Sequence, residues 1–164
     1  MTTNKVPAVP EGYHSVTPFV IVRGAVQFID FMKAAFDAVE LGRVGEDGAI
    51  GHAEVRIGDS VVMLFDSKPE WPETPAFLRL YVEDCDATYQ QALNAGGTSV
   101  TIPTNMPWGD RVARIRDPFS NLWWIMTRIE DLTEEEIGQR YGVKEYIDAM
   151  EYVQGADFFG LKRH

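Results

Sequence analysis

Residues 51–65, Gly-His-Ala-Glu-Val-Arg-Ile-Gly-Asp-Ser-Val-Val-Met-Leu-Phe, are the stretch that decides the fold class. Apolar and polar side chains alternate through Gly51–Ile57, which is the two-residue period of a strand with one buried face. Gly58-Asp59 is typical of a tight turn, and the apolar run Ser60–Phe65 follows it. The stretch therefore predicts two strands joined by a hairpin.

The residues before this hairpin predict a strand and then a helix. Val16–Val22 is an apolar run with β-branched residues, which favours a strand. Gly24–Ala38 carries apolar residues at helical spacing. Residues 45–48, Gly-Glu-Asp-Gly, predict a turn before the hairpin. The first part of the chain thus has the order strand, helix, strands.

The same order recurs about 60 residues later, as a repeat of pattern with slight identity. Phe77–Val82 predicts a strand, and Asp84 or Asp86 can cap a helix that ends at Ala95-Gly96-Gly97. The remaining strands of this half are predicted at Thr98–Ile102, Arg111–Ile115 and Leu122–Thr127. The last two form a hairpin around residues 117–121.

These elements predict an α+β fold. Two βαβββ modules would form a curled mixed sheet around a cleft, with helices outside and a C-terminal helical tail. We expect an N-terminal arm over residues 1–13 and a single domain over 14–130, with modules at about 14–68 and 75–128. Residues 131–164 would form a helical extension, with a capping box at Thr133–Glu136 and a second helix at Val143–Val153.

Composition excludes several classes of partner. The formal net charge of −10 argues against nucleic acid and against anionic membrane surfaces, because both attract clustered Lys and Arg. No stretch approaches the roughly 20 apolar residues of a membrane span, and the first residues do not suggest a signal peptide. Cys85 is the single cysteine and is interpreted as a buried apolar residue. A cytoplasmic location is the resulting prediction.

Several motifs resemble the vicinal oxygen chelate superfamily, and within it the PhnB-like branch of glyoxalase, bleomycin resistance and dioxygenase proteins. The resemblance covers about residues 12–140. One departure is Ser120, where relatives usually carry Gly at a turn position that favours positive φ. The motifs that carry the resemblance are residues 16–19, 25–32, 51–60, 80–84, 108–111 and 116–123.

Enzymes of this superfamily bind a divalent metal through His and Glu side chains on four strands. By strand matching, the resemblance places those positions at Thr17, Met63, Phe77 and Trp124. A thioether and aromatic carbons are poor ligands for hard or borderline cations, and one hydroxyl cannot hold a metal. The sequence therefore predicts that the metal site is lost and that no cofactor is bound.

Strand alternation predicts which side chains line the cleft. Aromatic and Met side chains predominate, with Arg as the polar component, which suits a flat or aromatic organic molecule. The predicted function is metal-independent binding of a small apolar or aromatic molecule, as in bleomycin resistance proteins. Equally open is a structural or interaction domain whose hollow is filled by these side chains. The candidate ligand-binding residues are Phe19, Met63, Arg79, Tyr81, Trp108, Arg111 and Trp124.

A third interpretation is an enzyme of the lyase, isomerase or dioxygenase kind with atypical residues. His52 and Glu54 lie two residues apart on one strand face and can form an acid–base pair, and Arg111 is the third candidate. The family also pairs modules across subunits, so a homodimer is expected. The tail residues Tyr146, Met150, Phe158 and Phe159 would then contact the partner.

Overall fold

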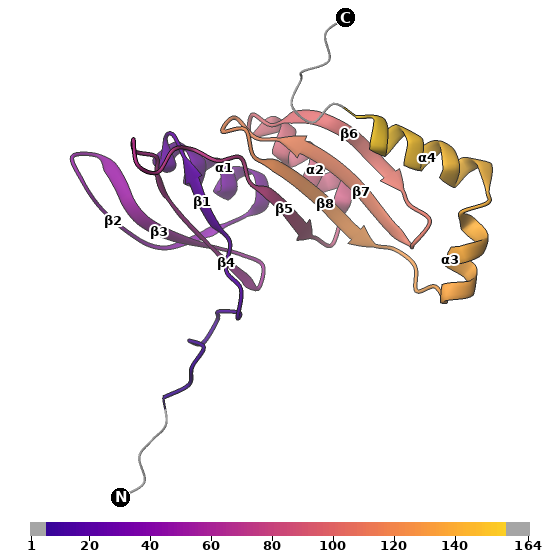
Figure 1. Cartoon of the computed structure of the whole chain (residues 1–164), viewed down its shortest axis with the longest axis horizontal. Helices are drawn as coiled ribbons and strands as arrows, with labels where there is room; N and C mark the ends of the chain where they lie inside the picture. The colour runs from indigo at the N-terminus through magenta and orange to yellow at the C-terminus, as the bar shows by residue number, and fades with distance from the viewer. Residues whose placement is uncertain (1–5, 157–164) are drawn as a thin grey trace, which may run out of the picture. The chain divides into compact units, whose positions relative to one another are not determined.

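The computed structural model describes residues 6–156. The chain divides into two compact units, one comprising residues up to 33 together with 37–74, the other residues 34–36 together with those from 75 onward. Each unit has its own four-stranded mixed sheet, seen at the indigo-to-magenta and the rose-to-orange parts of the ribbon in Figure 1. The predicted α+β class, the two modules and the C-terminal helices are confirmed.

The first unit follows the predicted order of elements. Its sheet has the strand order β1-β4-β3-β2, with β1 parallel to β4 and the other pairs antiparallel. Helix α1 buries Phe28, Ile29 and Met32 completely, because these residues recur on one side of the helix. The elements are β1 Phe19–Val22, α1 Ala25–Phe36, β2 Val39–Glu46, β3 Ala49–Ile57 and β4 Ser60–Asp66.

Strand β2 was not predicted as a separate element. It is an exposed edge strand with two register irregularities against β3, so it lacks the alternating burial that marks a strand in sequence. Gly45 sits at one irregularity, where a Cβ would lie 1.9 Å from the Ala49 carbonyl oxygen. A glycine interpreted as a turn residue is therefore required for close approach within a strand.

The second unit repeats this topology, with the strand order β5-β8-β7-β6 and a parallel β5–β8 pair. Asp84 caps α2, because its side chain accepts a hydrogen bond from the Ala87 amide. Helices α3 and α4 follow the last strand (Figure 1). The elements are β5 Phe77–Tyr81, α2 Cys85–Asn94, β6 Thr98–Asn105, β7 Asp110–Arg116, β8 Leu122–Arg128, α3 Glu134–Arg140 and α4 Lys144–Gly155.

The turn between β7 and β8 is organised by one buried carboxylate. Asp117 accepts hydrogen bonds from the Phe119 and Asn121 amides, the Asn121 side chain and the Trp123 indole. Ser120 has a φ of 72°, the positive value for which glycine is favoured. Serine at position 120, where relatives usually carry glycine, therefore still adopts the positive-φ conformation of the turn.

The tail begins with the predicted capping box at Thr133 and Glu136, which is confirmed. Helix α4 then packs on the second sheet. Val153 is buried with Met106, Val112 and Met126, and Ala149 and Met150 pack beside them. The apolar side of α4 thus covers its own unit, while Phe158 and Phe159 lie outside the described residues. Within residues 6–156, no helix has the length and apolar character needed to cross a membrane.

Candidate functional site

The face of the first sheet opposite its buried side holds the candidates of the first module. In β3, Ala53 and Val55 are fully buried, whereas His52 and Glu54 are half-buried on the other face. The Phe19 ring on β1 meets the His52 ring edge-on, with 5.8 Å between ring centroids. Phe65 lies 5.0 Å from Phe19. The rings of Phe19 and Phe65 therefore lie beside the His52–Glu54 pair, on the face that strand alternation predicted.

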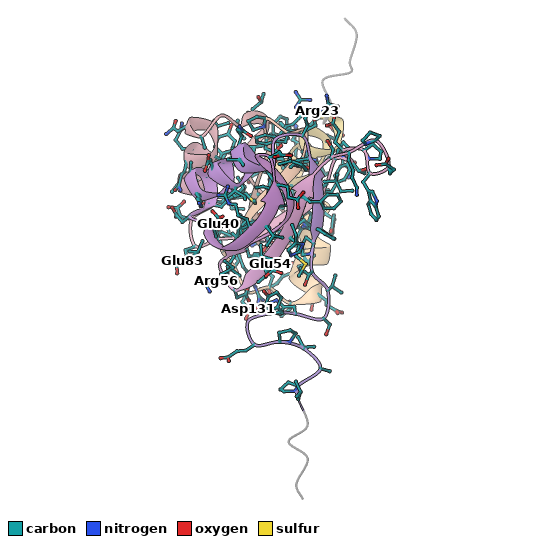
Figure 2. All side chains as sticks on the ribbon, turned by 90° about the vertical axis from the view of Figure 1, so that its left-hand side faces the viewer. Arg23, Glu40, Glu54, Arg56, Glu83 and Asp131 are labelled. Carbon is teal, nitrogen blue, oxygen red and sulfur yellow. The ribbon has the colours of Figure 1, made fainter. Side chains whose placement is uncertain are left out.

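A short hydrogen-bond chain organises the polar part of this face. The Tyr13 hydroxyl donates to one oxygen of Glu54, and His52 Nε2 lies 3.1 Å from the other. These two bonds hold the pKa of Glu54 below its ordinary value, and the carboxylate in turn raises the pKa of Tyr13. Glu54, labelled in Figure 2, is thus an ionised carboxylate that orients an imidazole.

A shallow hollow of about 270 Å³ lies beside this pair. His52 and Glu54 form one side of it, and residues 41–44 of β2 form the other. Gly42 is the register partner of Glu54 and has no side chain to fill the space. The hollow therefore exists because β2 carries glycine opposite a half-buried carboxylate.

Residues at matching positions form a row across each sheet. The first row is Phe19, Met63, Glu54 and Gly42, on neighbouring strands β1, β4, β3 and β2. The second row is Arg79, Trp124, Arg114 and Thr101, on β5, β8, β7 and β6. Two guanidinium groups contact the Trp124 ring. Cζ of Arg79 lies 5.0 Å and Cζ of Arg114 lies 4.7 Å from the ring centroid.

Arg114 is buried and connects the second row to the tail. It is 1% exposed, and its guanidinium donates to the Val153 carbonyl in the last turn of α4 and to the Thr101 hydroxyl. Burial lowers the pKa of Arg114 to about 10, which still leaves the group charged at neutral pH. A cation at the carboxyl end of a helix is stabilised by the exposed carbonyls and the helix dipole.

Tyr81 and Trp108 both donate to one buried acceptor. The Tyr81 hydroxyl lies 3.1 Å and the Trp108 indole nitrogen 3.0 Å from Asp110 Oδ2. Asp110 is 6% exposed. Five of the seven candidate ligand-binding residues belong to the second unit, namely Arg79, Tyr81, Trp108, Arg111 and Trp124.

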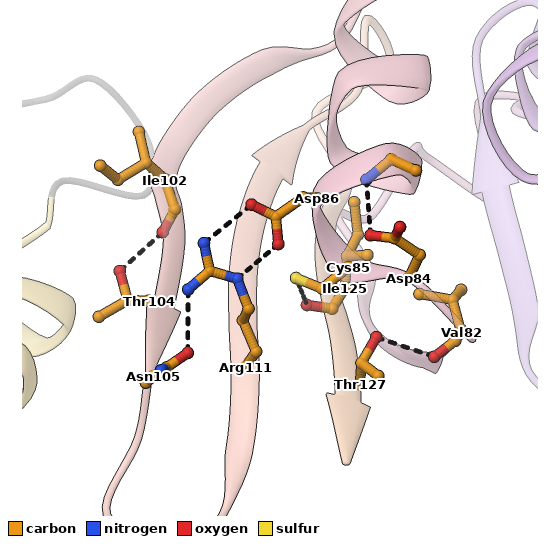
Figure 3. A network of polar contacts seen from close by, with 11 residues as sticks. Val82, Asp84, Cys85, Asp86, Ile102, Thr104, Asn105, Arg111, Ile125 and Thr127 are labelled. Carbon is orange, nitrogen blue, oxygen red and sulfur yellow. Dashed lines mark hydrogen bonds and ion pairs between the residues drawn. The ribbon is translucent and has the colours of Figure 1, made fainter. Parts of the chain in front are cut away.

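Arg111 lies on the face of the second sheet that is opposite to Trp124 and Arg114. Figure 3 shows its guanidinium facing Asp86 at the start of α2, with two hydrogen bonds to that carboxylate and a third to Asn105. Cys85 beside it is buried and donates to the Ile125 carbonyl, and burial raises the pKa of this thiol to about 11. Arg111 therefore anchors α2 to β7.

The donor sets at the expected metal positions do not fit a metal. Met63 occupies the second place of the first row and Trp124 the equivalent place of the second. Phe77 precedes Arg79 on β5 by two residues, and Thr17 precedes β1. Among residues 6–156, no three His, Cys, Asp or Glu side chains gather in a group able to hold an ion. We therefore derive no step through a metal.

Sequence reasoning missed two residues that shape these faces. Tyr13 was assigned to a loose arm, yet its phenol bonds to Glu54. Asp110 was not among the candidate residues, yet it accepts hydrogen bonds from Tyr81 and Trp108. Only Asp110 had a usable signal, since strand alternation places it on the same face as Arg114. The position of Tyr13 depends on long-range contacts that carry no local pattern.

Comparison with known proteins identifies the family. The sequence profile of the Glyoxalase/Bleomycin resistance protein/Dioxygenase superfamily matches residues 14–125. The chain belongs to this superfamily. An uncharacterized protein of Mycobacterium bovis is 40% identical over 135 residues, which are 75% of this chain and 89% of that protein. An uncharacterized protein of Mycobacterium tuberculosis has the same identity, over 79% of its length.

Several solved structures share the fold at low sequence identity. TioX from Micromonospora sp. is 21% identical, with a TM-score of 0.60, over 73% of this chain and all of that one. TnmS3 from Streptomyces sp., an antibiotic binding protein, is 22% identical, with a TM-score of 0.56, over 70% and 97%. An enzyme of the superfamily from Burkholderia phytofirmans has a TM-score of 0.59 at 18% identity, over 72% and 98%. Proteins that share this fold thus include both an antibiotic binding protein and an enzyme.

Proposed function

We propose that this chain binds a small apolar or aromatic organic molecule without a metal, as a cytoplasmic member of the PhnB-like branch. The observation that supports the proposal is the set of aromatic side chains left accessible around Arg79. Phe77 is 58% and Tyr81 is 64% exposed, and half-buried Trp124 lies beside them. Exposed aromatic groups beside a few polar ones are typical of small-molecule sites. The description of TnmS3 as an antibiotic binding protein agrees with this class of function.

Calorimetric titration with a panel of aromatic compounds tests the proposal. Trp124→Ala should weaken binding at least several-fold, because stacking contributes roughly 0.5–1.5 kcal/mol beyond area burial. Trp71→Ala is the matched control, since Trp71 is exposed and lies in the first unit. No binding, together with a loss of about 3–5 kcal/mol of stability in Trp124→Ala, would support the filled-core interpretation instead.

The metal-free part of the proposal has its own test. Elemental analysis of purified protein should find less than one equivalent of Zn, Ni, Mn or Fe per chain, because Met63, Phe77 and Trp124 offer no suitable ligand. One equivalent that resists dialysis would contradict it.

An enzyme is the second candidate, and the hydrogen-bond chain from Tyr13 to His52 favours it. Glu54 holds Nε2 of the imidazole, which leaves Nδ1 able to accept a proton from a molecule in the neighbouring hollow. His52→Ala would then abolish turnover of a bound compound with little change in stability. Binding without chemical change after long incubation would count against this candidate.

We also propose a homodimer. Strand β2 is a sheet edge that exposes Val39, Leu41 and Val44, and an apolar edge favours pairing with another chain. Sedimentation at micromolar concentration should give twice the 18.5 kDa chain mass. A monomer at that concentration would contradict the proposal.

A further inference from the structure

Strand β5 presents three side chains on one face in the order aromatic, cation, aromatic. Phe77, Arg79 and Tyr81 are alternate residues of this strand, and all three are exposed. Alternate residues of a strand point to the same side and lie about 7 Å apart. β5 is also an edge strand of its own sheet.

The Arg79 guanidinium has hydrogen-bonding capacity left over. Its one hydrogen bond within residues 6–156 runs from Nη2 to the Met126 sulfur, a weak acceptor, at 3.1 Å. No carboxylate of the described chain lies within 4.0 Å of it. Arg111 offers the contrast, since Asp86 and Asn105 engage three of its donor atoms.

Contacts with its neighbours hold this guanidinium in place. It lies over the Trp124 ring, with 5.0 Å from its central carbon to the ring centroid, while Arg114 lies 4.7 Å from the same ring. The second row therefore brings two positive charges to one indole and contains no acidic residue. Although the whole chain is acidic, charges beyond about 10 Å are largely screened at 0.1 M salt. The nearby Asp110 carboxylate already accepts hydrogen bonds from Tyr81 and Trp108, so the two guanidinium groups favour an anionic ligand.

We infer that this face binds planar aromatic anions, with a carboxylate on Arg79 and the ring system against one of the two flanking aromatic side chains, Phe77 or Tyr81. The inference rests on the proposed function and names the class of ligand. An arginine fork bonds a carboxylate through two parallel N–H groups, and such charge-assisted bonds are about twice as strong as neutral ones. The neighbouring rings supply the apolar contact that a free guanidinium in water lacks.

Paired probes test the inference. Calorimetric titration with 2-naphthoate and with its neutral analogue 2-naphthamide should give at least about 10-fold tighter binding of the anion. Arg79→Gln should remove this preference and leave the naphthamide affinity unchanged. Arg79→Lys keeps the charge but loses the fork, and should give an intermediate preference.

Arg128→Gln is the matched control. Arg128 lies on β8 four residues beyond Trp124, pairs with Asp131, and carries the same charge without contacting the indole. It should leave the preference for naphthoate intact, and thermal unfolding verifies that each variant is folded. Equal losses in Arg79→Gln and Arg128→Gln would overturn the inference in favour of a diffuse charge effect. Equal affinity of the wild type for both probes would overturn the inference while leaving the proposed function standing, and binding of neither would overturn both.

Discussion

The first row and the second row occupy the same places in two sheets of the same topology, yet they differ at every position. Where the first row has Glu54, half-buried and bonded to Tyr13, the second has Arg114, buried and bonded to α4. On the next strand of the first sheet, Gly42 pairs with Glu54 and leaves an open hollow. On the next strand of the second sheet, Thr101 pairs with Arg114 and accepts a hydrogen bond from it. The repeated backbone therefore supports two faces of opposite charge, one open and one partly covered by the tail.

The C-terminal helix α4 is part of the second face, because it covers some of the side chains there. Met106, Val112 and Met126 would be an apolar surface without Val153 and Met150 of α4. The helix leaves Arg79, Phe77 and Tyr81 exposed. One half of the second sheet is thus filled by the chain itself, and the other half is accessible to a ligand.

The largest expected effect concerns the two hairpin turns. Asp117→Ala would leave three buried donors and one part-buried donor without their acceptor and should lower the free energy of unfolding by about 3–5 kcal/mol. Asp59→Ala changes the exposed turn of the first sheet and should cost less than about 0.5 kcal/mol. Urea denaturation of both variants measures the contrast. Equal losses in the free energy of unfolding would contradict the prediction, because the two turns would then contribute equally to stability.

Removal of the tail should affect only the second sheet. A chain ending at Arg140 loses the apolar cover of Met126 and Val112 and should be less stable by about 2–4 kcal/mol. Hydrogen exchange should become faster in β7 and β8 and stay unchanged in β3 and β4. Sedimentation of the same variant tests whether the tail also supports a dimer. Unchanged exchange in β7 would show that α4 is an appendage.

Acid should weaken the first sheet through Glu40. Hydrogen bonds from Arg43 and Lys33 lower the pKa of Glu40 to about 2, from its ordinary value of 4.5. A lowered carboxylate pKa contributes stability above the unfolded value, and that contribution is lost as pH falls from about 4.5 towards 2. We expect a loss of about 1 kcal/mol, because the pair is partly solvated. Glu40→Gln should remove this part of the pH dependence, and an unchanged acid profile would contradict the assignment.

The smallest effect concerns the arm. Tyr13→Phe removes a hydrogen bond that lowers the pKa of Glu54, so that pKa should rise towards its ordinary value. Tyr141→Phe is the control, since Tyr141 is exposed and lies in the other unit. Carbon-detected NMR titration of the Glu54 carboxyl follows the change. An unchanged Glu54 pKa would mean that residue 13 does not contact it in solution.

Local periodicity accounts for what the sequence by itself determined. Alternation in residues 51–57 predicted which side chains of β3 are buried, and the Thr133 capping box placed the start of α3. Both patterns work because they arise from neighbours in the chain: a strand repeats every two residues, and a cap satisfies amides within one helical turn. The α+β class and the two modules follow from the same signals.

The tertiary structure decided which distant groups meet. The sequence predicted Arg79 and Arg111 as ligand-binding residues and did not single out Arg114. The structure places Arg79 on an exposed edge strand, Arg111 against Asp86 and Arg114 under α4. It also brought Tyr13 to Glu54 across 41 positions and β2 into the sheet despite its glycines. Such contacts depend on strand pairing and helix docking over long separations, and no local period encodes them.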